Sequence, residues 1–293
     1  MNLAHHAIPP VVDGPPLEAS LAVSGTGRPL HTQGMQAARG WAAGWASHVG
    51  LRHVERGRPC EDSIAIDWPP GPVDGLHVAV SDGVSAGACA AVASATAANH
   101  LVGLRPEYPE WGDADHLRES QAELAGRIVQ ADAVVQSAIA QYSPRSGAAT
   151  FSAAWLSADG HGWVCRVGDC RAWRWWTDEN GQVQLQLLGP DQDYLQMAEA
   201  PPPGVPPFNP ARMIGNGMVG QPSPWDVYLG SGEGLLLTSD GIHSILTQQD
   251  LAMLLERGTR RRLGLGPVAR SMERLARHRG SRDDVAVLIL VRR

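Results

Sequence analysis

The sequence predicts an α+β fold, a layered sandwich in which antiparallel sheets pack on each other and helices lie outside them. The first observation is the order of the expected elements along the chain: strands, two helices, many strands, two helices and a last strand. A doubly wound parallel sheet would instead alternate strand and helix regularly. The second observation is size, because 293 residues with 43% hydrophobic content can bury a sizeable core.

Two units are expected along the chain. Residues 1–38 are rich in Pro, Gly, Ser and Ala and show no hydrophobic periodicity, which indicates a flexible N-terminal extension. Regular patterning begins at Trp41, so residues 39–293 are expected to form the folded domain.

The first half of this domain is expected to contain three strands and two helices. An Ala-rich segment without proline predicts one helix, and apolar residues at helical spacing predict a longer one. Asp113 is the expected N-cap of the longer helix, and Pro144 would end it. The expected strands are 41–48, 62–68 and 76–81, and the expected helices are 85–103 and 114–142.

The second half is expected to be mostly strands. Apolar runs separated by Asp and Gly turns predict them, and helical periodicity returns twice before the last strand. Residues 200–224 are dense in proline, and an irregular insert of this length in a compact domain is typically a functional flap. The expected strands are 148–157, 162–168, 171–177, 183–188, 226–229, 234–238 and 284–291, and the expected helices are 248–257 and 266–278.

The composition argues against several classes of function. The net charge is −6 and no basic stripe appears, so no nucleic acid partner is expected. No apolar run is long enough to span a bilayer and no secretory signal is recognisable, so no membrane partner is expected. Four scattered cysteines without a CxxC pair argue against disulfides or structural zinc and suit a reducing compartment. We therefore expect a cytoplasmic monomer.

Aspartates stand at the ends of several expected strands. The segments LHVAVSDG (76–83) and LLLTSDG (235–241) are apolar strands that end in Ser-Asp-Gly. One such end alone is most often a simple Asp-Gly turn, and two in one chain weaken that interpretation. Further acidic residues precede two other strands or lie between strands: Glu61 and Asp62, Asp283 and Asp284, and Asp169.

This pattern of carboxylates points to divalent cations. Clustered carboxylates repel one another unless a cation neutralises them. Oxygen ligands without neighbouring His or Cys favour Mg²⁺ or Mn²⁺ over zinc. Two such ions bridged by a carboxylate can clamp a phosphate and activate a water molecule, so the strand ends predict a site for phosphate chemistry.

Six segments follow one another along the chain: EDS (61–63), SDG (81–83), SGAATFSAAWL (146–156), VGDCRAW (167–173), TSDG (238–241) and RDDVAV (282–287). Taken together, they resemble the type 2C, metal-dependent (PPM) protein serine/threonine phosphatases, and their bacterial members in particular. No single segment is specific, whereas the full set in this order is. The resemblance spans about residues 41–291 and implies a four-layer α-β-β-α sandwich of two antiparallel sheets flanked by helices.

The resemblance also implies roles for individual residues. Asp82 matches the aspartate that bridges two Mn²⁺ or Mg²⁺ ions, and Gly83 matches a residue whose carbonyl binds one of them. Asp240 and Asp283 match further metal ligands, and Asp62 matches an acid that reaches the first ion directly or through water. The implied activity is hydrolysis of phosphoserine or phosphothreonine in a protein substrate by metal-activated water, without a covalent intermediate.

The phosphate-binding residues depart from the family pattern. The family usually has an arginine five residues before the first aspartate, and this chain has Gly57 there. Arg56 and Arg58 flank that position, and either could hold phosphate through a bidentate fork. Arg58 is the favoured candidate, against the alternative of a simple surface arginine.

Two ions are expected rather than three. Arg145, Ser146 and Ser244 stand where relatives with a third ion have acids, although Asp169 is retained. A third ion would therefore be weak and held partly through water. Val84 stands where some members have a proton-donating histidine, which leaves that task to water.

Two other functions remain open at this point. A phosphatase-like binding or sensing module without turnover would account for the missing arginine and the altered third-ion region. A metal-dependent phosphohydrolase acting on a small molecule would have an identical core. The segment around 190–224 is expected to decide between substrates.

Overall fold

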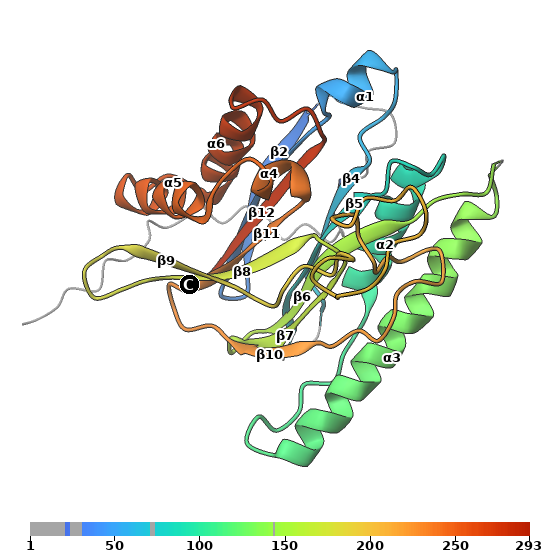
Figure 1. Cartoon of the computed structure of the whole chain (residues 1–293). Coiled ribbons are helices and arrows are strands. Elements are labelled where there is room, and N and C mark those ends of the chain that lie inside the picture. The colour runs from blue at the N-terminus through green and yellow to red at the C-terminus, as the bar shows by residue number, and fades with distance from the viewer. Residues whose placement is uncertain (1–20, 24–30, 71–73, 143) are drawn as a thin grey trace, which may run out of the picture.

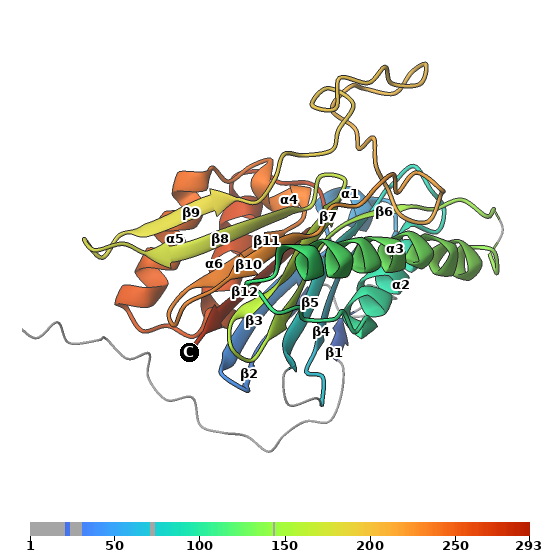
Figure 2. The same cartoon turned by 90° about the horizontal axis from the view of Figure 1, so that it is seen from below.

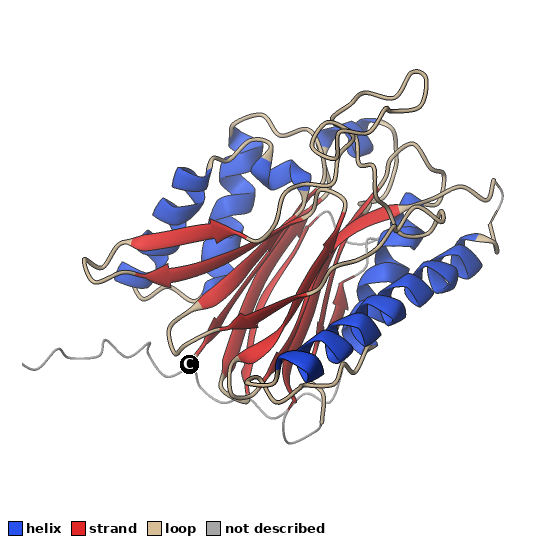
Figure 3. Cartoon of the chain, turned by 60° about the horizontal axis from the view of Figure 1, so that its bottom comes forward, coloured by secondary structure: helices blue, strands red, loops and turns tan. Residues whose placement is uncertain are grey.

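Two six-stranded antiparallel sheets pack face to face in this protein, and helices flank them on both outer sides (Figure 1, Figure 3). The structure, a computed structural model, describes residues 21–23, 31–70, 74–142 and 144–293. The arrangement confirms the predicted α+β fold and its four layers.

The first sheet has the strand order β1-β4-β5-β6-β7-β10. On its outer side lie α2 (Ala90–Gly103) and the long helix α3 (Ala114–Ile139), which Figure 2 shows in front of the sheet. Asp113 caps α3 as predicted, because its carboxylate accepts hydrogen bonds from the first-turn amides. The strands are β1 (Leu21–Val23), β4 (Asp62–Asp67), β5 (Asp74–Gly83), β6 (Ala149–Ser157), β7 (His161–Val167) and β10 (Trp225–Tyr228).

The second sheet has the order β2-β3-β12-β11-β8-β9. The helices α5 (Gln248–Arg260) and α6 (Leu265–His278) cover its outer face, and Gly44 lets α6 approach β3 closely. A Cβ on Gly44 would lie 2.4 Å from the backbone of α6. The strands are β2 (His31–Ala38), β3 (Trp41–His48), β8 (Arg171–Thr177), β9 (Val183–Leu187), β11 (Gly234–Thr238) and β12 (Val285–Arg292).

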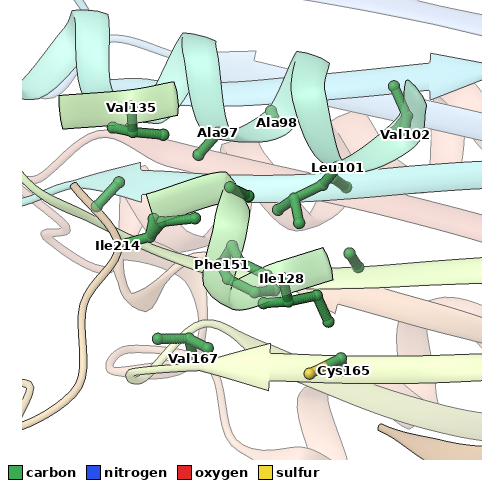
Figure 4. Close-up of a cluster of buried hydrophobic side chains, with 14 of the residues drawn as sticks. Ala97, Ala98, Leu101, Val102, Ile128, Val135, Phe151, Cys165, Val167 and Ile214 are labelled. Carbon is green, nitrogen blue, oxygen red and sulfur yellow. The ribbon is translucent and has the colours of Figure 1, made fainter. Parts of the chain in front are cut away.

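Three apolar cores fill the spaces between the four layers. The central core lies between the sheets and includes Trp41, Leu76 and Leu288, each fully buried. A second core joins α2 and α3 to the first sheet, where Phe151 and Ile128 meet (Figure 4). The third lies under α5 and α6. Because both faces of each sheet are buried, the central strands are apolar at nearly every position.

The N-terminal prediction is wrong in part. Residues 31–38, expected to belong to a flexible extension, form β2, which pairs with β3 along its whole length. Residues 21–23 form β1 beside β4. The remainder of the expected extension, residues 1–20 and 24–30, lies outside the described residues. Two short helices were also not predicted: α1 (Leu51–Glu55) and α4 (Asp240–His243).

Residues 188–224 form the irregular segment predicted between β9 and β10, and we call residues 190–224 the flap. In Figure 2 its outer part projects away from the sheets. Among the helices that the structure describes, none is long and apolar enough to cross a membrane.

Candidate active site

The predicted acidic residues meet at one end of the two sheets. Asp62 begins β4 and pairs directly with Asp82 near the end of β5. Asp240 follows β11, and Asp283 precedes β12, which pairs with β11 in antiparallel fashion. Asp169 lies in the turn from β7 to β8. Strand ends far apart in the sequence thus deliver five carboxylates to one region.

Asp62 is held by the second sheet although it belongs to the first. Its side chain is buried, and its Oδ2 accepts a hydrogen bond of 2.6 Å from the Ser239 hydroxyl. Ser239 in turn accepts from the amide of Ala286 at 2.9 Å. The other oxygen, Oδ1, is buried and has no hydrogen-bond partner among the described residues. A buried carboxylate oxygen without a partner is costly, which makes it available to a cation.

The carboxyl groups raise one another's pKa. Burial raises the pKa of Asp82 well above its usual value, and the charges of Asp62 and Asp240 raise it further. Burial and then Asp284 have the same effect on the pKa of Asp62. Burial and the charge of Asp240 raise the pKa of Asp169 to about 7. The cluster therefore resists ionisation until positive charge is supplied.

Asp240 and Asp283 complete the cluster on the side of the second sheet. Burial, followed by the charge of Asp283, raises the pKa of Asp240. The side chain of Asp283 is 35% exposed and lies 3.2 Å from a guanidinium nitrogen of Arg52. Asp283 thus faces the open side of the cluster.

The neighbouring Asp284 is placed differently. Its side chain is buried and accepts hydrogen bonds from the amides of Gly50 and Glu61 and from the ring of His53. These contacts occupy both carboxylate oxygens. Asp283 also accepts bonds, from Arg52 and from the amide of Asp284, but its side chain is 35% exposed, so it is the one of the two that a ligand can reach.

Position 83 has no room for a side chain, so it requires glycine. A Cβ there would lie 2.5 Å from the carbonyl oxygen of Ala90 and 2.9 Å from that of Glu61. The amide of Gly83 also donates to the Glu61 carbonyl at 3.0 Å. The end of β5 is therefore packed tightly against the start of β4 and the start of α2.

The two arginines predicted to bind phosphate lie in different surroundings. Arg58 is 2.5 Å from the carboxylate of Glu61, and it donates to the carbonyls of Ser85 and Gly87. Arg56 is exposed at the C-terminal end of α1. Neither is brought against the carboxylate cluster by a hydrogen bond or ion pair that the described residues show.

Arg52 was missed as a site residue, and Glu61 was noted only as an acidic residue before a strand, without a role. Arg52 reaches the cluster from α1 through its contact with Asp283, and its charge lowers the pKa of Asp240 against the stronger effects of burial and Asp283. No short sequence motif marks it, because it lies ten residues before Asp62 and depends on α1 for its direction. Glu61, the first acid of the EDS segment, pairs with Arg58 and accepts from the Ser85 hydroxyl beside the cluster.

The cluster fits hard divalent cations by its chemistry. The donors are carboxylate oxygens with an adjacent backbone carbonyl, the ligands that Mg²⁺ and Mn²⁺ prefer. In the described part of the chain, no three His, Cys, Asp or Glu side chains are grouped so that they could hold a metal ion as the structure stands, so the fit rests on the chemistry of the donors.

The flap is anchored beside the cluster. Asp191 binds two arginines at once, the fully buried Arg166 at 2.7 Å and Arg171 at 2.6 Å. At the other end of the flap, Asp132 of α3 accepts from the amide of Gly215 at 2.6 Å. Between these anchors, a pocket of about 460 Å³ is lined by residues that include Gln192, Met197, Arg212 and Met218.

The comparison with known families agrees with this architecture. Residues 49–200, just over half of the chain, match the family model described as Protein phosphatase 2C. The chain belongs to the protein phosphatase 2C family. The sequence matches none of the curated proteins.

Solved phosphatase structures share the fold. The serine/threonine phosphatase PstP/Ppp of Mycobacterium tuberculosis is 18% identical, with a TM-score of 0.62 over 86% of this chain and 98% of that one. The PstP catalytic domain in complex with two manganese ions is 19% identical, with a TM-score of 0.61 over 86% and 97%. A serine-threonine phosphatase 2C of Toxoplasma gondii is 15% identical, with a TM-score of 0.65 over 91% and 100%.

Proposed function

We propose that this member of the protein phosphatase 2C family hydrolyses phosphoserine or phosphothreonine in proteins with the help of two Mn²⁺ or Mg²⁺ ions. The observation that carries the proposal is the carboxylate cluster of Asp62, Asp82 and Asp240, where burial and mutual repulsion raise the pKa of each. A scaffold without turnover has no physical reason to keep such a destabilising group.

The candidate metal ligands are the carboxylates that act on one another within the cluster. Asp82 is paired with Asp62 across β4 and β5, and the charge of Asp240 raises its pKa further, so these three carboxylates would hold the ions together with the Gly83 carbonyl. Asp283 would add a ligand from the open side, and the buried Oδ1 of Asp62 has no hydrogen-bond partner among the described residues that would compete with a cation. Ions bound there would supply Lewis-acid activation of a water molecule and of the phosphoryl group.

Arg52 is the best placed residue for holding the phosphate. Its side chain is 54% exposed and its guanidinium already lies at the open side of the cluster, beside Asp283. A guanidinium can bind two phosphate oxygens in parallel. Arg58 is better suited to fixing Glu61, because it already pairs with that buried carboxylate.

The flap supports a protein rather than a small-molecule substrate. It presents Leu195 and Phe208 to solvent at 69% and 70% exposure, and such apolar side chains are suited to contact a protein surface. The pocket between the flap anchors could take a side chain that flanks the phosphorylated residue.

The free thiols at Cys60, Cys89, Cys165 and Cys170 fit a reducing compartment such as the cytoplasm.

The test compares Asp82→Asn and Asp240→Asn with the wild type on a phosphopeptide and on p-nitrophenyl phosphate, with and without Mn²⁺. We expect metal-dependent turnover by the wild type and a loss of at least about 100-fold, roughly 3 kcal/mol in the barrier, in both variants. Asp226→Asn, an exposed carboxylate on the edge strand β10, is the matched control and should keep full activity.

Two results would contradict the proposal. Full activity in both cluster variants would show that the site is elsewhere. Absence of hydrolysis together with absence of Mn²⁺ binding in calorimetry would favour a binding or sensing module without turnover.

A further inference from the structure

His53 is a fully buried histidine directly behind the carboxylate cluster. It lies on α1 with 1% of its surface exposed, and the proposed chemistry gives it no role. Its ring contacts groups from three other chain segments: the start of β12, the start of β4 and the turn after β5.

One ring nitrogen faces Asp284. The Nδ1 atom lies 2.8 Å from Oδ2 of Asp284. The same carboxylate accepts from the amide of Gly50 at 2.6 Å and from the amide of Glu61 at 2.5 Å. Asp284 therefore ties α1 to the starts of β4 and β12, and the ring completes its set of donors.

The other ring nitrogen faces Ser85 and Glu61. The Nε2 atom lies 3.2 Å from the Ser85 hydroxyl and 3.4 Å from Oε2 of Glu61. The Ser85 hydroxyl donates its own proton to Glu61 at 2.6 Å, so toward the ring it can only accept. Both ring nitrogens thus face acceptors, Asp284 on one side and Ser85 with Glu61 on the other.

The residues that His53 contacts are chain neighbours of the proposed metal ligands. Asp284 follows Asp283, and Glu61 precedes Asp62. The Glu61 carbonyl accepts from the amide of Gly83, at 3.0 Å. A shift of the ring would therefore displace ligands on both sheets at once.

We infer that His53 is a positioning residue, which fixes the carboxylate cluster for metal binding by joining Asp284 to Glu61 and Ser85. The inference rests on the proposed function, because it concerns the same ions. Groups that orient metal ligands through hydrogen bonds typically change metal affinity about 10- to 100-fold when they are removed. His53 does not touch the substrate, so its effect on the rate would follow from metal occupancy.

The experiment measures Mn²⁺ binding by calorimetry on the full chain, with thermal unfolding recorded for each variant. The amide nitrogen of His53→Asn can take the place of Nδ1 and keep the bond to Asp284, whereas that of His53→Gln takes the place of Nε2 and loses it. We expect Mn²⁺ binding to weaken about 10-fold or more in His53→Gln. His53→Asn should bind more tightly than His53→Gln.

His77→Gln is the matched control. His77 is also fully buried, but it lies at the other end of β5, bonded to the Val102 carbonyl and the Tyr108 hydroxyl. Its substitution should lower the unfolding temperature and leave Mn²⁺ affinity unchanged. This control separates loss of positioning from general destabilisation of the β-sheet.

The outcomes distinguish the inference from the proposed function. Wild-type Mn²⁺ affinity in His53→Gln, or equal affinities in His53→Gln and His53→Asn, would overturn the inference alone. Failure of the wild type to bind Mn²⁺ would overturn the proposed function and this inference with it.

Discussion

Replacing Asp169 by Asn should stabilise the metal-free protein as the pH rises. Asp169 has an ordinary pKa of 3.8, and burial and the charge of Asp240 raise it to about 7 in the folded protein. Between these two values the folded state keeps a proton that the unfolded chain has lost. The free energy of unfolding therefore falls as the pH rises through this window, and it reaches its low value above the folded pKa.

The size of the effect follows from the shift. A pKa change from 3.8 to about 7 corresponds to roughly 4 kcal/mol, an upper limit for the gain from Asp169→Asn above pH 7. At about 2 °C for each kcal/mol in a chain of this size, the gain in unfolding temperature is at most about 8 °C. At about pH 4 the difference in stability should be small, because the folded carboxyl is protonated and the unfolded one, with a pKa of 3.8, has lost only little more than half of its protons.

The assay is thermal unfolding in excess chelator between about pH 4 and 8. The wild type and Asp169→Asn are compared at each pH, which cancels the contribution of His243, whose pKa burial lowers to about 3. Asp159→Asn is the control with opposite sign. Burial raises the pKa of Asp159, but hydrogen bonds from the Ser157 hydroxyl and the His161 amide outweigh it, and the pKa is lowered. Asp159→Asn should therefore destabilise the folded protein.

The reasoning is refuted if Asp169→Asn is no more stable than the wild type at any pH in chelator. Added Mn²⁺ provides a second check. Ligand binding to the folded state raises its stability, and the wild type should gain more than Asp169→Asn if the ions use the charge at this position.

Three further substitutions test other contacts of the site and of the fold. Arg52→Ala should raise KM for a phosphopeptide roughly 10-fold or more, because a charged hydrogen bond contributes about 1.5–3 kcal/mol, whereas Arg56→Ala should leave KM unchanged in the same steady-state assay. Asp191→Ala should cost about 3–5 kcal/mol in urea unfolding, because it leaves the buried Arg166 without its counter-charge; an unchanged midpoint would contradict this. Thr247→Ala removes the capping box of α5 and should cost about 1 kcal/mol by the same measurement, with unchanged activity.

Most strands and the four long helices could be predicted because each carries a local pattern. The segment 284–291 is apolar throughout, and it forms a central strand buried on both faces. In RAWRWW (171–176), Trp173 and Trp175 are buried, as alternation predicts. The helix α2 begins at residue 90 rather than at the predicted residue 85, because residues 84–89 form turns at the site.

The missed elements lack such patterns. The strand β2 has the sequence HTQGMQAA, which is polar and contains only one large apolar side chain. Its place is fixed by pairing with β3, a contact that single-sequence periodicity does not contain. The helix α1 has five residues, too few for helical periodicity to appear. Arg52 could not be identified for the same reason, since only α1 directs it toward Asp283.

The last motif shows why residue type alone does not assign a role. Asp283 and Asp284 are adjacent and chemically identical, yet one is 35% exposed beside Arg52 and the other is buried against Gly50 and His53. Successive residues entering a strand point to opposite sides, so the backbone of β12 separates their surroundings. After burial, the charge of Asp284 is the largest cause of the raised pKa of Asp62. His53 and the backbone amides around Asp284 offset that charge, which links the choice of Asp at this position to the histidine behind it.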